Sequence, residues 1–303
     1  MKKLKIINLI MSFCLIFSSC GEYQNYFSST PDTHESFNLG EQLEIQYIDV
    51  GQGDSQLIFL PNGETMLIDG GDTFCSDTIC QYLKNENVEK IDFLVATHPH
   101  ADHIGGLDDV LNEISVETLI MPKVADSDIP TTKTYEYFLD SVINNGCEVV
   151  RAKPDISLIE DEEIDLYAKC LGPQKDDYSD LNNYSAVILI EYKSHSFLFM
   201  GDALFESENE LLNQGEDISA DILKIGHHGS HSSTGDEFLE EVNPQYAIVS
   251  AGVGNRYGHP HDETMEKLEE NGIEIYRTDR DGTIVAKSDG TEITIETNQK
   301  HLY

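Results

Sequence analysis

The stretch Thr97-His98-Pro99-His100-Ala101-Asp102-His103 decides how this chain is interpreted, because it holds three imidazoles and a carboxylate within six residues. It directly follows the apolar run Ile91–Thr97, which predicts a buried strand. In an extended stretch, side chains at i and i+2 share a side, so His98 and His100 can hold one ion together. The carboxylate and the third imidazole then face a second position. Neutral imidazoles with a carboxylate suit zinc, and also manganese or iron, so we expect a two-position metal site at the end of this strand.

Two further polar clusters also follow apolar runs. Met200-Gly201-Asp202 comes after the strand predicted over 197–200, and Gly226-His227-His228-Gly229-Ser230-His231 after the strand predicted over 221–225. A carboxylate between two cations holds them about 3.5–4 Å apart, so we expect Asp202 to bridge both positions. At least one of His227 and His228 is expected to complete the set of ligands. A fourth patch, Tyr257-Gly258-His259-Pro260-His261, is either a catalytic part or only a loop that leads into the next helix.

In this order the clusters resemble the metallo-β-lactamase superfamily of binuclear metal hydrolases, with a hairpin ending in Leu67-Ile68-Asp69-Gly70-Gly71 before them. The resemblance extends from about Leu43 to Glu296. It implies an α/β (α+β) fold, a four-layer αββα sandwich with the metal site at one edge of its sheets. Within the superfamily, the chain most specifically resembles the C-terminal domain of ComEC-type DNA-uptake proteins. The matching stretches are IDVGQGDS at 48–55, HPHADHIGG at 98–106, LKIGHHGS at 223–230 and NRYGHPH at 255–261.

The chain departs from the wider superfamily at one ligand. Many members place another histidine between the H-x-H-x-D-H motif and the bridging aspartate, whereas His195 is the only histidine between His103 and Asp202 here, in a predicted turn. Where the extra histidine is expected, the chain has Asn182-Asn183-Tyr184-Ser185, which also resembles the ComEC-type pattern. One ion would then have fewer protein ligands and more exchangeable positions. This favours a loosely held or manganese-like second ion over zinc at both positions.

The ligand set and the resemblance together assign roles to individual residues. The predicted cofactors are two divalent metal ions, Zn or Mn, one held by His98 and His100 and the other by Asp102, His103 and either His227 or His228. The predicted catalytic residues are Asp102, Asp202 and His259, of which His259 would protonate a leaving group or contact a phosphate. Asp69 is expected to orient a ligand and Asp54 to serve the site. The candidate supporting or anion-contacting residues are Asn183, Ser185, Ser230, Ser232, Ser233 and Arg256.

Length and charge limit the organisation and the partners. Strands are predicted over 43–49, 56–60, 65–69, 91–97, 118–121, 186–192, 197–200, 221–225, 246–250, 273–276, 283–287 and 292–296, and helices over 78–85, 107–113, 135–144, 203–213, 238–242 and 262–271. No long linker interrupts them, so residues 42–303 are expected to form one domain. The formal net charge of the 303-residue chain is −37, which disfavours a broad surface for long nucleic acid.

The first twenty residues, MKKLKIINLIMSFCLIFSSC, predict an export signal. Three lysines precede an apolar stretch that is too short to span a bilayer comfortably. The ending Ser18-Ser19-Cys20 resembles a bacterial lipobox, so residues 1–19 are predicted to be a lipoprotein signal peptide and Cys20 the lipidated N-terminus. The alternatives are an ordinary signal peptide or an uncleaved anchor. Residues 20–41 are interpreted as a flexible tether that holds an extracytoplasmic domain at the membrane.

Several alternatives remain open at this level. The predicted substrate is a small or short phosphodiester; the enzymatic alternatives are a phosphorylcholine esterase-like activity or hydrolysis of a small ester or lactone. The non-enzymatic alternative is a ligand-binding lipoprotein with an inactive metal site. The cysteines at 75, 80, 147 and 170 form either the pairs Cys75/Cys80 and Cys147/Cys170 or four free thiols.

Overall fold

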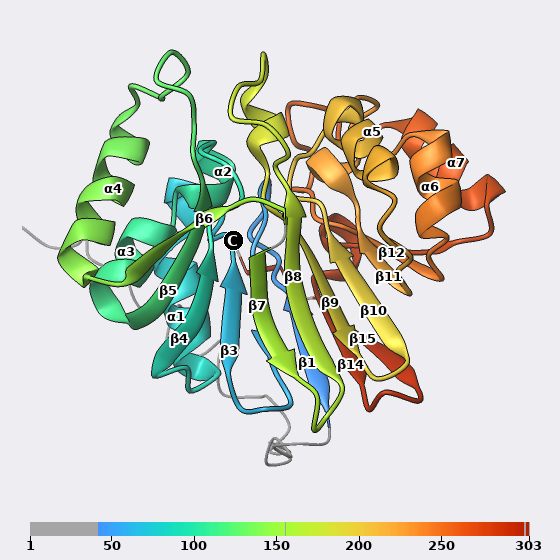
Figure 1. Cartoon of the computed structure of the whole chain (residues 1–303), viewed down its shortest axis with the longest axis horizontal. Coiled ribbons are helices and arrows are strands. Elements are labelled where there is room, and N and C mark those ends of the chain that lie inside the picture. Colours follow the sequence, from blue (N-terminus) through green and yellow to red (C-terminus); the bar gives the residue numbers. More distant parts are fainter. Residues whose placement is uncertain (1–41, 155, 300, 303) are drawn as a thin grey trace, which may run out of the picture. The chain divides into compact units, whose positions relative to one another are not determined.

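The computed structural model describes residues 42–154, 156–299 and 301–302, so the predicted signal peptide, Cys20 and the tether lie outside the described residues. Two sheets form the centre of the fold (Figure 1). In spatial order, the eight-stranded sheet contains β15 (Ile293–Asn298), β14 (Thr283–Ser288), β1 (Leu43–Tyr47), β2 (Gln56–Phe59), β3 (Thr65–Ile68), β4 (Lys90–Val95), β5 (Ser115–Pro122) and β6 (Glu148–Ala152). The seven-stranded sheet contains β13 (Glu274–Arg277), β12 (Tyr246–Val249), β11 (Ile222–Lys224), β10 (His195–Phe199), β9 (Val187–Tyr192), β8 (Leu166–Gly172) and β7 (Ile156–Asp161).

Alternation along the strands explains why the two sheets stack. On β9, Ile188 and Ile190 enter a core that they share with Ile45 and Tyr47 of β1, whereas Leu189 faces the opposite side of its sheet. A strand directs successive side chains to opposite faces, so a strand that is apolar at every position is buried on both. The core between the sheets therefore forms from the inner faces of both.

Helices cover the two outer faces. One set packs on the eight-stranded sheet: α1 (Ser76–Asn85), α3 (Leu107–Glu113) and α4 (Lys133–Asn145) share a second core with it. The other set, α5 (Phe205–Gln214), α6 (Asp236–Val242) and α7 (Asp262–Glu270), shares a third core with the seven-stranded sheet. Figure 1 shows the two sets flanking the sheets. The layers are thus helix, sheet, sheet and helix, which confirms the predicted αββα sandwich.

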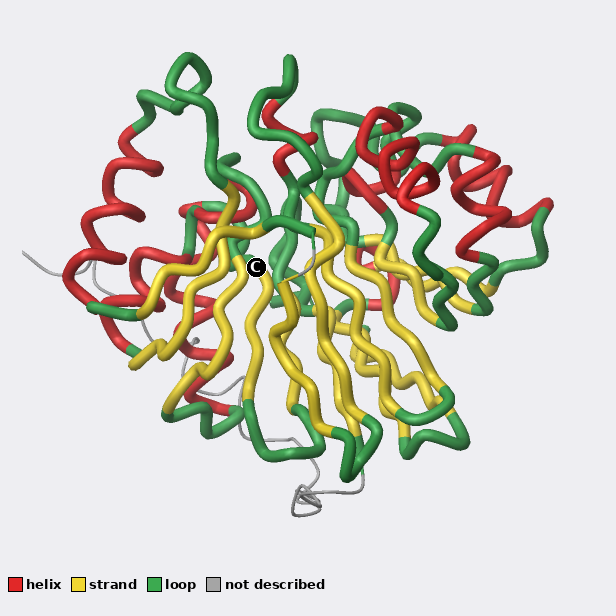
Figure 2. The backbone as a smooth tube through the Cα atoms, in the orientation of Figure 1, coloured by secondary structure: helices red, strands yellow, loops and turns green. Residues whose placement is uncertain are grey.

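The direction of the strands places the motifs on one edge. β3, β4 and β5 run parallel, and so do β10, β11 and β12. The carboxyl ends of parallel strands lie at the same edge of a sheet, which is where α/β proteins commonly bind ligands. Loops gather along this edge of both sheets (Figure 2). All three histidine clusters and Asp202 lie on loops or short helical turns that follow these strands.

The structure differs from the sequence-based expectation at β6, β7 and β8, which were not predicted. His195 was expected in a turn but opens β10, where its Nδ1 lies 2.7 Å from Ser288 Oγ at the end of the strand remote from Asp202. Cys75, Cys80, Cys147 and Cys170 are all free thiols. Among the residues that the structure describes, no helix has the length and apolar character required to cross a bilayer.

Candidate metal centre

The H-x-H-x-D-H segment leaves β4 and turns into the short helix α2 (Ala101–Ile104). The loop between β1 and β2 packs directly on it, since Asp54 N donates to Asp102 O at 3.1 Å. Gly53 permits this approach: its φ is +140°, and a Cβ there would lie 2.3 Å from Asp102 O. The GQGD motif of the sequence therefore shapes the floor of the site.

Two groups of ligand-type atoms face a common region. In the first group, His98 Nε2 lies 3.0 Å from His100 Nδ1 and 3.7 Å from Asp202 Oδ2. Ligands about 2.1 Å from a tetrahedral ion are about 3.4 Å from one another. These separations therefore fit one cation.

The second group lies on the other side of the same carboxylate. Asp202 Oδ1 is 3.3 Å from His103 Nε2 and 3.5 Å from His228 Nε2, and the latter is 3.5 Å from Asp102 Oδ2. Three of these atoms, Asp202 Oδ1, His103 Nε2 and His228 Nε2, are buried without a hydrogen-bond partner. Buried polar atoms are almost always paired, so three that converge without partners are suited to bind a cation. The nitrogen and oxygen donors fit zinc or manganese.

Asp202 therefore has the placement expected of a bridging ligand. Its two oxygens face different groups of imidazoles, and it is 2% exposed. Ser185 fixes it, because the backbone N–H of Asp202 donates to Ser185 Oγ at 3.0 Å.

Asp69 supports the second group from behind. Its Oδ2 lies 2.7 Å from His103 Nδ1, and its two oxygens accept hydrogen bonds from the backbone N–H and the hydroxyl of Thr97. All three residues are fully buried. An ionised carboxylate only accepts, so the shared proton lies on His103 Nδ1, and Nε2 is the nitrogen that faces the site.

A second buried carboxylate supports His228. His228 Nδ1 lies 3.0 Å from Ser250 O and 3.3 Å from Asp54 Oδ1, and Asp54 Oδ2 accepts from Lys224 Nζ at 2.7 Å. Lys224 is only 1% exposed, which is rare for a lysine without a partner. Sequence reasoning missed Lys224, although it lies inside the LKIGHHGS motif.

The backbone conformation of the short helical turn Gly226–Gly229 directs the side chains of its two adjacent histidines to different places. His227 and His228 both have positive φ, 47° and 55°, which is uncommon for histidine. His228 turns inward into the second group, whereas His227 is half-buried, with Nε2 3.9 Å from Asp202 Oδ2 and Nδ1 3.0 Å from Ser232 Oγ. The structure thus places His228 among the ligand-type atoms and His227 beside the cleft.

The cluster is rich in carboxylates. It contains Asp54, Asp69, Asp102 and Asp202, together with one buried ammonium, that of Lys224, which pairs with Asp54. Burial disfavours a charged imidazole, yet the nearby Asp202, Asp102 and Asp54 raise the pKa of His228 to about 10. Burial likewise opposes ionisation of Asp202, but His228 and His103 hold its pKa well below the usual range. The carboxylates therefore attract positive charge, as a site for divalent cations requires.

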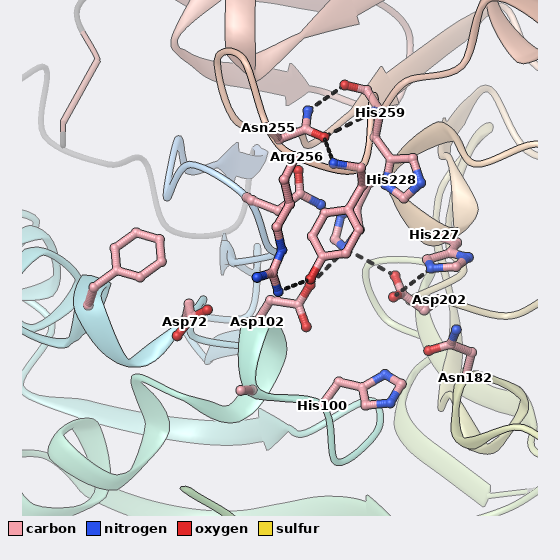
Figure 3. A pocket seen from close by; sticks show the side chains of 14 residues that line it. Asp72, His100, Asp102, Asn182, Asp202, His227, His228, Asn255, Arg256 and His259 are labelled. Carbon is pink, nitrogen blue, oxygen red and sulfur yellow. Dashed lines mark hydrogen bonds and ion pairs between the residues drawn. The ribbon is translucent and has the colours of Figure 1, made fainter.

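A cleft of about 620 Å³ opens onto both groups (Figure 3). Its lining includes His100, Asp102, Asp202, His227, His228 and the loop that carries Asn255, Arg256, Tyr257 and His259. Asn255 organises this loop by accepting from Tyr257 N and His259 N and by donating to His259 O. Burial and the rings of His228 and His227 lower the pKa of His259 to about 4, so this ring is neutral at pH 7. His261, by contrast, precedes α7 as its N-cap residue.

The remaining predicted polar residues differ in position. Arg256 lines the cleft, where it donates to Tyr257 Oη at 2.6 Å. Asn183 is buried and accepts from Leu204 N and Ser207 Oγ, and the buried Ser233 donates to Gly226 O. Ser230 Oγ contacts Ser232 Oγ at 2.9 Å, behind His227. Asn183 and Ser233 thus brace loops, and neither lines the cleft.

A family comparison agrees with this geometry. The model of the Metallo-beta-lactamase superfamily matches residues 48–253, more than half of the chain. The chain belongs to the metallo-beta-lactamase superfamily. The matched region thus includes the two histidine clusters at 98–103 and 227–231 together with Asp202, and it ends before His259.

Relatives within the superfamily include competence proteins. The chain is 33% identical to ComE operon protein 3 of Bacillus subtilis over 264 residues, which is 81% of this chain and 33% of that protein. It is 28% identical to Competence protein ComA of Neisseria gonorrhoeae, over 78% of this chain and 31% of that protein. The resemblance to ComEC-type proteins is confirmed, and the chain spans about a third of the length of these curated relatives.

A solved structure shows the same fold. Igni18, a metallo hydrolase from the archaeon Ignicoccus hospitalis, superposes with a TM-score of 0.52 at 16% identity. The match covers 80% of this chain and 98% of Igni18. At this identity the likeness concerns the fold alone.

Proposed function

We propose that the chain is a metal-dependent hydrolase that cleaves phosphodiester bonds in small or short substrates. The observation that carries the proposal is the position of Asp202 between two groups of buried ligand-type atoms, at the floor of an open cleft. Two divalent cations bound there would supply an activated water and neutralise negative charge that develops on the substrate.

The residues would divide the work as follows. His98 and His100 would hold one ion, and Asp102, His103 and His228 the other, with Asp202 between them. Asp69 faces Nδ1 of His103, and Ser250 O and Asp54 face Nδ1 of His228, so Nε2 of each ring is directed to the cleft and would give up its proton to bind an ion. Preorganised ligands of this kind need no rearrangement when substrate binds.

The cleft wall would bind the substrate. Arg256 is the only lysine or arginine in the described lining, so it is the side chain suited to pair with a phosphate that lies away from the ions. His259 is neutral and lines the same wall, where it can donate a hydrogen bond to a phosphoryl or leaving-group oxygen. Both side chains come from the NRYGHPH loop.

Two observations support the reaction class and the substrate size. The relatives named as competence proteins favour a phosphodiester over a lactone or a β-lactam. The net charge of −37 and the single cationic side chain of the cleft favour contact with one or two phosphates over a long duplex.

The test is metal analysis of the purified protein followed by a substrate panel with added manganese or zinc. The panel contains bis-p-nitrophenyl phosphate, dinucleotides, plasmid DNA, phosphorylcholine esters, lactones and a chromogenic β-lactam. We expect phosphodiester turnover that falls at least about a thousandfold in Asp202→Asn, because the shared ligand is lost. Turnover of lactone or β-lactam without phosphodiester cleavage would reject the reaction class.

We also propose that the protein is exported and lipidated at Cys20, as the N-terminal sequence predicts. In the native host, wild-type protein should fractionate with membranes and Cys20→Ala should be released. Equal membrane retention of both proteins, without a mass increase in the wild type, would contradict lipidation.

A further inference from the structure

Asn182 is a buried amide whose oxygen has no partner. It lies in the short helical turn Leu181–Tyr184 and is 6% exposed, yet its Oδ1 accepts no hydrogen bond. Leaving a buried acceptor unpaired is unfavourable, so an amide in this state indicates a group that the protein alone does not supply.

The surroundings of Asn182 show which group is missing. The residue lines the cleft together with His100 and Asp202, which both belong to the first ligand group. In Figure 3 the amide oxygen of Asn182 points toward the gap between these two side chains. An amide oxygen that faces a carboxylate and an imidazole and accepts no hydrogen bond is suited to a cation.

The neighbouring asparagine is different. Both functional atoms of the Asn183 amide are used: Oδ1 accepts from Ser207 Oγ at 3.0 Å, and Nδ2 donates to Glu206 Oε2 at 3.3 Å. Asn183 therefore fastens the turn to α5, which leaves Asn182 free to face the cleft. The sequence alone had singled out Asn183.

We propose that Asn182 is a ligand of the first cation, where it takes the place of the histidine that this chain lacks. The inference rests on the metal-dependent function proposed above and adds a preference for one metal. The first ion would have two imidazoles, a carboxylate and an amide oxygen as ligands. A third imidazole in place of the amide would make this set of ligands softer. Because amide and carboxylate oxygens suit manganese, the first position prefers manganese more strongly than a three-histidine site would.

The test is metal binding, which is measured without substrate. Metal-free protein is titrated with Mn²⁺, the free ion is followed by electron paramagnetic resonance, and Zn²⁺ is then titrated in competition. We expect Asn182→Ala to bind one of two ions at least about tenfold more weakly and the other unchanged. Asn182→Asp, which keeps an oxygen, should bind no more weakly than the wild type. Asn213→Ala, on the exposed side of α5, is the matched control.

Two further variants locate the effect. Asn182→His should shift the ratio of Mn²⁺ to Zn²⁺ affinity about tenfold toward zinc. His100→Ala removes a member of the first ligand group only. When Asn182→Ala is added to His100→Ala, we expect no additional loss of metal affinity.

Each result decides between the inference and the function on which it rests. If the wild type binds two ions and Asn182→Ala binds both within about twofold of it, the role of Asn182 is wrong and the proposed function stands. If Asn182→Ala does not fold, an unchanged Mn²⁺/Zn²⁺ ratio in Asn182→His overturns the inference instead. If the wild type binds no divalent ion, the proposed function itself fails.

Discussion

Replacing Asp69 by asparagine tests whether the second ligand group is held from behind. Three donors converge on the Asp69 carboxylate, namely Thr97 N, Thr97 Oγ1 and His103 Nδ1, at 2.8, 2.7 and 2.7 Å. Asparagine offers a single acceptor oxygen, so at least one donor loses its partner, and the new N–H group repels His103 Nδ1–H. The ring of His103 then rotates or moves its proton to Nε2, the atom that faces Asp202.

The magnitude follows from the geometry. A buried hydrogen bond to a charged group contributes about 1.5–3 kcal/mol, and each 1.4 kcal/mol corresponds to about tenfold in affinity. We therefore expect Asp69→Asn to weaken the binding of one metal ion by about 10- to 100-fold through the changed orientation of His103. Titration calorimetry of metal-free protein with Mn²⁺ measures this change. Asp109→Asn on the exposed face of α3 serves as the control, and wild-type affinity for both ions in Asp69→Asn would refute the reasoning.

The remaining predictions concern stability and substrate binding. Lys224→Met leaves Asp54 buried without its ammonium, so the free energy of unfolding in urea should fall by about 3–5 kcal/mol, and Lys224→Met/Asp54→Asn should recover part of it. Burial raises the pKa of Glu208 from 4.5 to about 7, so its stabilising contribution is complete below about pH 4.5 and is lost as the pH rises through 7. The side chain of Glu208→Gln cannot ionise. The free energy of unfolding of this variant minus that of the wild type should therefore rise between about pH 5 and pH 8. A difference that stays constant over this range would contradict the prediction. Hydrolysis of a dinucleotide should depend weakly on salt, with a slope of log kcat/KM against log salt near −1 or shallower, whereas a steep slope would indicate a basic groove.

Patterns along the chain predicted most of the fold because each apolar run also packs in the structure. The strands predicted over 56–60 and 65–69 pair as the hairpin of β2 and β3, and the helix predicted over 107–113 has the bounds of α3. Of the strands that were missed, β6 and β7 each form one edge of a sheet, and β8 lies next to β7. At an edge, one side of a strand lacks a partner and more side chains face solvent. The run Glu160-Asp161-Glu162-Glu163 consequently has the composition of a loop, although its first two residues belong to β7.

Only the site residues that lie close together in the sequence could be grouped from the sequence. His98, His100 and His103 stand together in the sequence, and the structure keeps them together because they follow one strand. The residues beside His228 come from distant parts of the chain: Asp54 and Lys224 are 170 positions apart, and nothing near either residue predicts the pair. Asn182 and Asn183 show a second limit, since two identical neighbours differ only in which side of a helical turn they occupy.

The distribution of charge explains how such an acidic chain could accept an anionic substrate. The cleft lining contains the carboxylates of Asp72, Asp102 and Asp202 against one guanidinium, that of Arg256. Without cations this cleft would repel a phosphodiester, because like charges oppose association. Two divalent ions would reverse the balance at the floor of the cleft while the surrounding surface stays negative. The attraction would then be confined to the few ångströms around the ions. This arrangement favours a substrate that presents one phosphodiester at a time, and it ties substrate binding to metal binding.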